Sequence, residues 1–355
     1  MTPPYADLGH VRCPAVTRRI WTLLVSLGLA TALGLLGALA TVPYVALRPG
    51  PTFDTLGVVG GKPVVDIRGA PTYPTSGHLN MTTVAVVDNV TLYGALALWI
   101  SGRSELVPRE EIFPPGLTEQ QVEQQNQQLF RQSETNAKAA ALRYLGYPTK
   151  VVIGQVVPTG AASGKLLADD RLLAVDGQNV RTAQQVVDLL AGSHPGQPVR
   201  VRFQRGSTPP QEVTITLGPG VQPGRGYLGV GVIDQPDVNF DITISLADVG
   251  GPSAGLMFAL AIVDKLTPGP LVGNTFVAGT GEITPDGRVG PIGGIPLKML
   301  RAREAGASVF LVPAGNCAEA AQRAPQGLQL VRVGTLAEAV HALDEIRTGQ
   351  QPPHC

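Results

Sequence analysis

The sequence predicts an α/β (α+β) protein with an N-terminal transmembrane helix, and three observations support this prediction. Residues 20–47 form a run of 28 residues without a charge. Segments such as 212–217 alternate apolar and polar residues, which is typical of half-buried strands. Apolar runs such as 256–263 are long enough to be buried helices. With 355 residues, the chain suits an anchor followed by two soluble domains.

The uncharged run at 20–47 is long enough to cross a bilayer. As a helix it would measure ~42 Å, more than the ~30 Å hydrocarbon core. Three arginines precede it against a single acid, Asp7. The positive-inside rule therefore predicts a cytoplasmic segment at 1–19, with the bulk of a single-pass cell-membrane protein outside the cytoplasm.

A cleaved signal peptide is the alternative interpretation of this run. Ala38-Leu39-Ala40 has the small-x-small form of a cleavage site. The apolar run is longer than that of a usual signal peptide and continues past the site, which favours retention as an anchor. In both cases the working part of the chain is expected to be extracytoplasmic.

Charge and cysteine content exclude some functions and leave others open. The 27 basic and 27 acidic side chains balance, so there is no electrostatic reason to expect nucleic acid as a partner. Cys13 falls on the cytoplasmic side. A bridge between Cys317 and Cys355 is permitted outside the cell, but three irregularly spaced cysteines favour unpaired thiols. We find no motif for a metal or cofactor, and the segment 160–166 lacks the spacing and the hydroxyl of a phosphate-binding loop.

A serine stands in a glycine-rich turn immediately before the apolar run at 256–263. The turn reads Gly250-Gly251-Pro252-Ser253-Ala254-Gly255. At the start of a helix, backbone N–H groups lie beside the serine hydroxyl and can stabilise an oxyanion. We expect these groups to come from Gly251, Ser253 and Ala254. The simpler alternative is that Ser253 only caps the helix.

A lysine in a second glycine-rich setting can supply the base that this serine lacks. Lys298 follows Pro291-Ile292-Gly293-Gly294-Ile295-Pro296-Leu297 at the start of another helical run. Removal from water disfavours the ammonium, and a pKa of roughly 7–8 would make the amine an effective base. An ordinary solvated lysine is the alternative. Together the two segments predict a serine–lysine hydrolase.

A Ser-His-Asp triad is the rival catalytic scheme. The sequence has five histidines, none within a recognisable motif: His10, His78, His194, His341 and His354. We expect His78 and His341 to lie on the surface.

The two glycine-rich segments, with Gly279-Thr280-Gly281-Glu282-Ile283 between them, resemble the proteolytic domain of Lon proteases. The resemblance is strongest to membrane-anchored, PDZ-containing bacterial relatives. It implies that Ser253 is the nucleophile, that Lys298 is the general base, and that the Thr280 hydroxyl orients the amine. One departure is that ATP-dependent Lon enzymes have an aspartate where this chain has Gly250; the nearest acid is Asp248.

Residues 147–218 resemble a PDZ domain of the bacterial protease type. Strands are predicted at 151–157, 199–203 and 212–217, with a hairpin at Asp176-Gly177 and a helix at 182–190 capped by Thr182. The peptide-binding loop, expected near 146–152, lacks the usual Gly-Leu-Gly-Phe. We expect a peptide to add as a strand beside 151–155, while a spacer or lid is the alternative role.

The residues on either side of the predicted PDZ domain are assigned by their position in the chain. Pieces at 77–82 and 133–137 resemble the start of a Lon proteolytic domain, so 48–146 is predicted to be its first part and 219–345 the remainder, followed by a tail at 346–355. The PDZ domain would then be inserted in the protease domain. A simple series of three domains is the alternative.

The resemblance implies an ATP-independent, extracytoplasmic serine endopeptidase whose PDZ domain engages peptides or flexible proteins. The alternative is a membrane-tethered PDZ adaptor with an inactive protease-like domain. Residues 20–47 would contact the bilayer, and homo-oligomerisation is left open.

Overall fold

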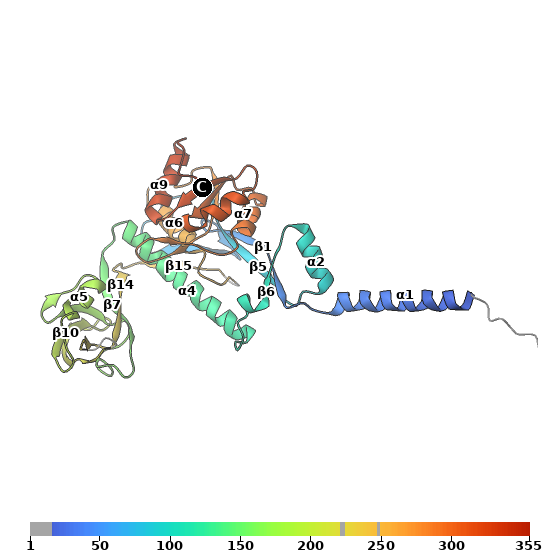
Figure 1. Ribbon diagram of the computed structural model, residues 1–355. Coiled ribbons are helices and arrows are strands. Elements are labelled where there is room, and N and C mark those ends of the chain that lie inside the picture. Colours follow the sequence, from blue (N-terminus) through green and yellow to red (C-terminus); the bar gives the residue numbers. More distant parts are fainter. Residues whose placement is uncertain (1–15, 221–223, 247–248) are drawn as a thin grey trace, which may run out of the picture. The chain divides into compact units, whose positions relative to one another are not determined.

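The computed structural model describes residues 16–220, 224–246 and 249–355 and divides into two compact units. The first unit comprises the described residues up to Pro49 together with Val84–Glu119. The second comprises Gly50–Thr83 and Gln120–Cys355. The predicted segment 48–146 is therefore divided between them. Figure 1 labels the elements of both units.

The first unit combines a long apolar helix with a small strand-and-helix assembly. Strand β1 (Tyr44–Asp54) pairs antiparallel with β6 (Glu105–Pro108) from Tyr44↔Pro108 to Leu47↔Glu105. Its helices are α1 (Val16–Leu39), α2 (Leu92–Ser101) and the short α3 (Arg109–Ile112). Ala46, Val90 and Ala95 form its small buried core.

Helix α1 is shorter than the predicted span at 20–47. It ends at Leu39, and the residues from Tyr44 onward belong to β1, so the predicted end at Leu47 is wrong. Pro43 explains the difference, because proline has no N–H for the helix and restricts the residue before it to extended conformations. The apolar segment Arg19–Leu39 still has 21 residues, about 32 Å of helix, which is long enough to cross a membrane.

The main sheet of the second unit joins strands from distant parts of the chain. Its order is β20-β19-β16-β5-β1, where β5 is His78–Val87, β16 is Phe276–Gly279, β19 is Val309–Pro313 and β20 is Gln329–Val333. Strands β5 and β16 are parallel, with Phe276 opposite His78 and Gly279 opposite Met81. Chain segments on both sides of the predicted PDZ domain therefore share one sheet.

Helices and short strand pairs complete this part of the unit. The helices are α4 (Glu119–Tyr144), α6 (Gly255–Leu266), α7 (Ile295–Glu304), α8 (Cys317–Gln322) and α9 (Leu336–Arg347), with a 3₁₀ turn at Ala314–Asn316. The strand pairs are β2 (Val58–Val59) with β3 (Lys62–Pro63), β4 (Val65–Arg68) with β15 (Asp241–Ile244), and β17 (Glu282–Ile283) with β18 (Val289–Gly290). Helix α6 lies at the centre of the core, because all its residues from Gly255 to Asp264 are buried. In Figure 1, α6, α7 and α9 gather beside the main sheet.

A second sheet lies within the same unit and has the order β11-β10-β8-β7-β14. Its strands are β7 (Thr149–Val156), β8 (Arg171–Val175), β9 (Gln178–Asn179, paired with β8), β10 (Pro198–Gln204), β11 (Gln211–Thr216) and β14 (Val230–Pro236). A short pair, β12 (Gly218–Pro219) with β13 (Gly226–Tyr227), precedes β14. The predicted boundary at 218 therefore falls inside this assembly, because β14 follows it along the chain and pairs with β7.

Local predictions for this sheet are confirmed in detail. Asp176 and Gly177 both have positive φ, 46° and 78°, at the tight turn between β8 and β9. Helix α5 (Ala183–Leu190) begins after Thr182, whose side chain forms a capping box with Gln185. Asp169 takes a φ of 67°, which aspartate tolerates better than most residues.

The expected peptide site beside 151–155 is wrong. Strand β7 pairs with β14 from Thr149 to Val156, and its other side pairs with β8 at Val151 and Val152. Both sides of β7 are therefore occupied by the chain itself. The sheet ends at β11 and at β14, and the outer side of β14, the end beside α5, is open to an added strand.

The C-terminal tail is fastened by a disulfide. Cys317 and Cys355 are bonded, with their Cα atoms 5.0 Å apart, so the preference for unpaired thiols is wrong for this pair. Arg332 of β20 donates a backbone hydrogen bond to Pro353, which holds the tail along β20 and carries Cys355 to α8. Sequence spacing contains no trace of this contact. Cys13 lies outside the described residues.

Candidate active site

The turn that carries Ser253 depends on glycines at positions where other chain segments approach closely. Gly251 has a φ of +84°, a conformation that glycine adopts without strain. A Cβ on Gly250 would lie 2.9 Å from Asn126 Cβ, and one on Gly255 would lie 2.7 Å from Ile283 Cγ2. The glycine pattern thus lets α4 and β17 pack directly against the turn.

Helix α4 holds this turn by two hydrogen bonds. The Gly251 N–H donates to Asn126 O at 2.9 Å, and Ser133 Oγ donates to Pro252 O at 2.9 Å. The sequence placed Ser133 in a segment resembling the start of a Lon domain, but gave no sign of its contact with Pro252. Asn126 was missed, because a helical asparagine in a glutamine-rich stretch resembles a solvated residue.

The structure brings Ser253, Lys298 and Thr280 together. Lys298 Nζ lies 2.9 Å from Ser253 Oγ and 3.0 Å from Thr280 Oγ1. Thr280 Oγ1 donates its proton to Ser253 O at 3.0 Å, so it can only accept from the lysine. When the amine is neutral, it donates to Thr280 and its lone pair is available to the Ser253 hydroxyl.

Lys298 lies inside the protein, with only 3% of its surface exposed. Helix α7 begins three residues earlier, and the loop before it is clamped by Asn316, whose side chain accepts from Ile292 N and donates to Ile292 O, both at 2.9 Å. Burial lowers the pKa of Lys298 from 10.5 to about 7. A substantial fraction of the amine is therefore neutral near physiological pH. Asp248, the nearest acid along the chain, lies outside the described residues.

The N–H groups around Ser253 differ in their availability. Gly251 N–H is already bonded to Asn126, so the expectation that it stabilises an oxyanion is not met in this conformation. Within the described ranges, the N–H groups of Ser253 and Ala254 donate to no protein acceptor. These two groups remain at the start of α6, where the helix dipole also favours negative charge.

The histidines are engaged elsewhere. His78 Nδ1 lies 2.8 Å from Asp54 Oδ2, and His341 Nδ1 lies 3.4 Å from Glu345 Oε1. Both side chains are exposed, as predicted. In the part of the chain that the structure describes, no hydrogen bond joins a histidine to Ser253.

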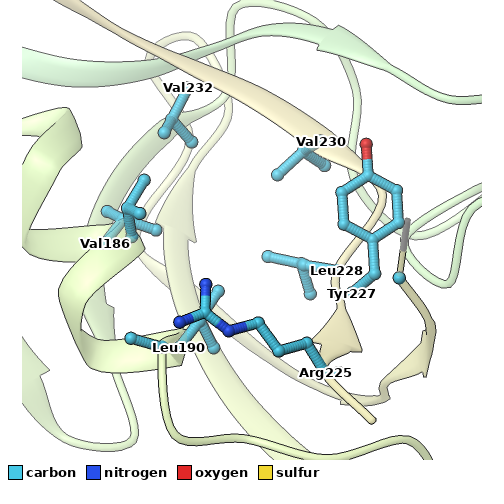
Figure 2. Close-up of a pocket in the computed structure, with 11 residues that line it drawn as sticks. Val186, Leu190, Arg225, Tyr227, Leu228, Val230 and Val232 are labelled. Carbon is cyan, nitrogen blue, oxygen red and sulfur yellow. The ribbon is translucent and has the colours of Figure 1, made fainter. Parts of the chain in front are cut away.

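A second candidate site lies between α5 and β14, and Figure 2 shows it as a hollow lined mainly by aliphatic side chains. Its volume is about 270 Å³. The labelled lining residues are Val186, Leu190, Arg225, Tyr227, Leu228, Val230 and Val232. The Arg225 side chain extends across the hollow toward Leu190, which places a guanidinium beside an apolar cavity.

The peptide-binding loop was expected near 146–152, whereas the hollow lies beside α5 and β14. The stretch Tyr227-Leu228-Gly229-Val230 lies at the start of β14 and has a glycine between apolar residues, as in Gly-Leu-Gly-Phe. Gly229 takes a φ of +81° and packs against Gly160 so closely that a Cβ would lie 2.6 Å from Gly160 Cα. This signal falls after residue 218, not near 146–152.

Comparisons with known proteins match two stretches of the chain. The family described as Lon protease (S16) C-terminal proteolytic domain matches residues 234–345, and a PDZ domain family matches residues 152–205. Lon protease of Clostridioides difficile is 43% identical over 77 residues, 22% of this chain and 10% of that protein. Lon protease of Rhizobium meliloti is 35% identical over 116 residues, 32% of this chain and 14% of that protein. The similarity thus covers only a small part of these relatives' length.

Solved structures are similar to a part of the chain. The PDZ domain of an SdrC-like protein from Listeria monocytogenes shows 20% identity and a TM-score of 0.22, covering 23% of this chain and 86% of that chain. A solution structure from Geobacillus thermodenitrificans shows 34% identity and a TM-score of 0.21, covering 23% of this chain and 94% of that chain.

The stretch that the Lon proteolytic family matches, residues 234–345, includes Ser253, Thr280 and Lys298. This chain carries a PDZ domain and a Lon-type C-terminal proteolytic domain, and through the latter it is a homologue of the Lon proteases.

Proposed function

We propose that the chain is an ATP-independent, extracytoplasmic serine endopeptidase that cleaves peptide bonds with a Ser253–Lys298 dyad. The observation that carries the proposal is a single contact: an amine buried to 3% exposure, with a pKa lowered to about 7, lies 2.9 Å from the Ser253 hydroxyl. An amine in this environment is a base, whereas a solvated lysine is a cation.

The reaction follows from this geometry. Neutral Lys298 accepts the Ser253 proton while Oγ bonds to the scissile carbonyl carbon. The carbonyl oxygen becomes an oxyanion, which the N–H groups of Ser253 and Ala254 stabilise. The Lys298 ammonium then protonates the leaving amine, and an acyl-enzyme remains. Lys298 next removes a proton from water, whose oxygen bonds to the acyl carbon. The bond between that carbon and Ser253 Oγ then breaks, the acid leaves, and the Lys298 ammonium returns its proton to Oγ.

Thr280 acts in this scheme as a positioning residue. Its hydroxyl donates to Ser253 O and accepts from the Lys298 amine, so both dyad residues are linked through one side chain. The arrangement keeps the lysine lone pair directed at Ser253 Oγ, since the other polar neighbour of the amine can only accept.

The groove between α5 and β14 is the proposed site of substrate engagement. The outer side of β14 is a free sheet edge beside the aliphatic hollow. A peptide can add to that edge as a strand and place an apolar side chain in the cavity. Peptides and flexible proteins are the substrates that suit such a site, because they supply an extended segment without prior unfolding by an ATP-driven motor.

The proposed location combines two observations. Helix α1 is long and apolar enough to anchor the chain in a membrane, and Cys317 is bonded to Cys355. Structural disulfides persist mainly in oxidising compartments. Together they support a single-pass protein whose proteolytic domain lies outside the cytoplasm.

The test uses the full chain in detergent or vesicles, without ATP, and a library of flexible fluorogenic peptides. We expect cleavage by the native protein and a loss of at least about 10²–10⁴-fold in Ser253→Ala and in Lys298→Arg, because the guanidinium stays charged and cannot act as the base. Lys165→Arg is the matched control, since that lysine is exposed and its amine donates to the backbone carbonyl of Thr214. Peptide binding without cleavage by the native protein would contradict the proposal and favour the adaptor.

A further inference from the structure

Helix α2 presents an apolar face that stays largely exposed in the described part of its own unit. Five large side chains are between 44% and 75% exposed: Leu92, Tyr93, Leu96, Trp99 and Ile100. Their spacing places them on one side of the helix, and we call this set the α2 stripe. The residues from 89 to 102 include no charged side chain. An apolar patch of this kind usually marks an interaction surface.

The α2 stripe is not required for the core of the unit. The opposite side of α2 packs through Ala95, which is buried with Ala46 and Val90, while Leu98 is partly buried against the same cluster. The helix is also fixed at both ends, by the Thr91 side chain at its start and by Gly102 in a left-handed conformation at its end. The stripe is therefore exposed on a well-anchored helix.

Hydrogen bonds place the start of α2 beside the end of α1. Leu92 N donates to Ala40 O at 3.1 Å, and Val42 N donates to Val90 O at 2.9 Å. The Tyr93 ring lies so close to Gly37 that a Cβ there would come within 2.6 Å of Tyr93 Cζ. Because α1 ends at Leu39, any membrane crossed by α1 has its surface at the level where α2 begins.

We propose that α2 lies in the interface of the lipid bilayer on the same side as the soluble part of the chain, with the α2 stripe inserted among the lipids. This inference rests on the proposed anchoring by α1. The ten residues of α2 measure about 15 Å, too short to cross the hydrocarbon core but suited to an interfacial helix. Trp99 and Tyr93 are residue types that favour this interface.

The two tryptophans of the chain allow a direct test, because Trp21 lies in α1 and Trp99 in α2. The full-length Trp21→Phe protein, reconstituted in phosphatidylcholine vesicles, reports on α2 alone. We expect Trp99 emission at shorter wavelength than in water, with quenching strongest for lipids brominated close to the headgroup. The full-length Trp99→Phe protein reports on α1 through Trp21.

Two further variants in the Trp21→Phe background test the role of the stripe. Leu96→Glu with Ile100→Glu should move Trp99 emission toward the value in water and reduce its quenching. Leu167→Glu is the matched control, since Leu167 is 51% exposed in the other unit and its substitution should leave Trp99 unchanged.

The outcomes separate this inference from the proposed anchoring. Unquenched Trp99 emission at the wavelength found in water, with Trp21 quenched, would overturn the inference and leave the anchor standing. If Trp21 is also unquenched, the anchoring fails and the inference fails with it. Trp99 emission at short wavelength that responds to protein dilution but not to brominated lipid would assign the stripe to a second copy of the chain, and would also overturn the inference.

Discussion

Helices α6 and α5 belong to the same unit but differ in how far the core encloses them. Every residue of α6 from Gly255 to Asp264 is buried, and the helix starts at the turn that carries Ser253. In α5 the only buried residue is Val186, and one side of the helix faces the hollow beside β14. The helix beside the candidate nucleophile is enclosed by the core, while the helix beside the candidate groove leaves a face open.

The difference follows from what each site has to do. A dyad requires atoms held within hydrogen-bond distance and an amine kept away from water, and both need packing on all sides. A groove has to admit a peptide, so one helix face and one strand edge have to stay unpaired. The comparison therefore predicts where substitutions act on stability and where they act on binding.

The largest expected effect comes from breaking the enclosure of α6. Phe258 is fully buried and its ring meets Phe130 edge to face, with centroids 5.8 Å apart. Phe258→Ala should lower the free energy of unfolding by about 3–5 kcal/mol, because it removes buried apolar area and leaves a cavity. Calorimetric unfolding of the full chain would measure the loss.

The matched substitution in α5 is Val187→Ala, at a side chain that is 52% exposed. It should change the free energy of unfolding by less than about 0.5 kcal/mol. Equal costs at the two positions would show that the two helices are not enclosed to different degrees.

The next effect concerns the titration of Lys298. Its pKa is about 7 in the folded protein and 10.5 when free, so the unfolded chain binds more protons between these values and stability rises with pH across that window. Lys298→Met removes this penalty. Allowing for two lost hydrogen bonds, we expect it to stabilise the fold by about 3 kcal/mol at pH 7 or below. The gain should disappear as pH approaches 10, as measured by unfolding at a series of pH values.

The rate of the proposed peptide cleavage should depend on pH through the same ionisation of Lys298. Because the neutral amine is the base, kcat/KM should rise as pH increases through about 7 and then level off. A rate that falls over this range, or a Lys298→Met protein whose stability follows the same pH dependence as the native one, would contradict a buried neutral amine.

The sequence predicted the residues at the centre of the candidate site better than those that hold them. Ser253, Lys298 and Thr280 stand in short segments whose glycines and prolines are visible locally, and the structure brings them together. Asn126 accepts from Gly251 through its backbone carbonyl, and the Asn316 side chain bonds to the backbone of Ile292, which is 24 positions away in sequence. Such contacts arise only when the chain has folded.

Fold predictions failed for the same reason where long-range pairing decides the structure. The strand-like and helical patterns at 151–157 and 182–190 were sufficient to locate β7 and α5. The residues of β7 do not indicate that this strand pairs with β14. The residues near Cys317 do not indicate that the C-terminal tail runs along β20. Pro43 was a local signal for the end of α1, but the predicted span followed the uncharged run past it to Leu47.

The smallest expected effect lies in the open groove. Arg225 is exposed, and its side chain extends across the hollow beside α5. Arg225→Ala should weaken binding of peptides with a free C-terminal carboxylate about tenfold, because a charge-assisted hydrogen bond is lost from a site that water can reach. The same peptides with an amidated C-terminus should bind both proteins equally weakly. Fluorescence anisotropy with Ser253→Ala as the background would measure binding without cleavage. Equal affinity of the Arg225→Ala and parent proteins for the free carboxylate would show that the groove recognises the strand and its apolar side chains rather than a chain end, in which case internal segments of flexible proteins would suit it as well as their termini.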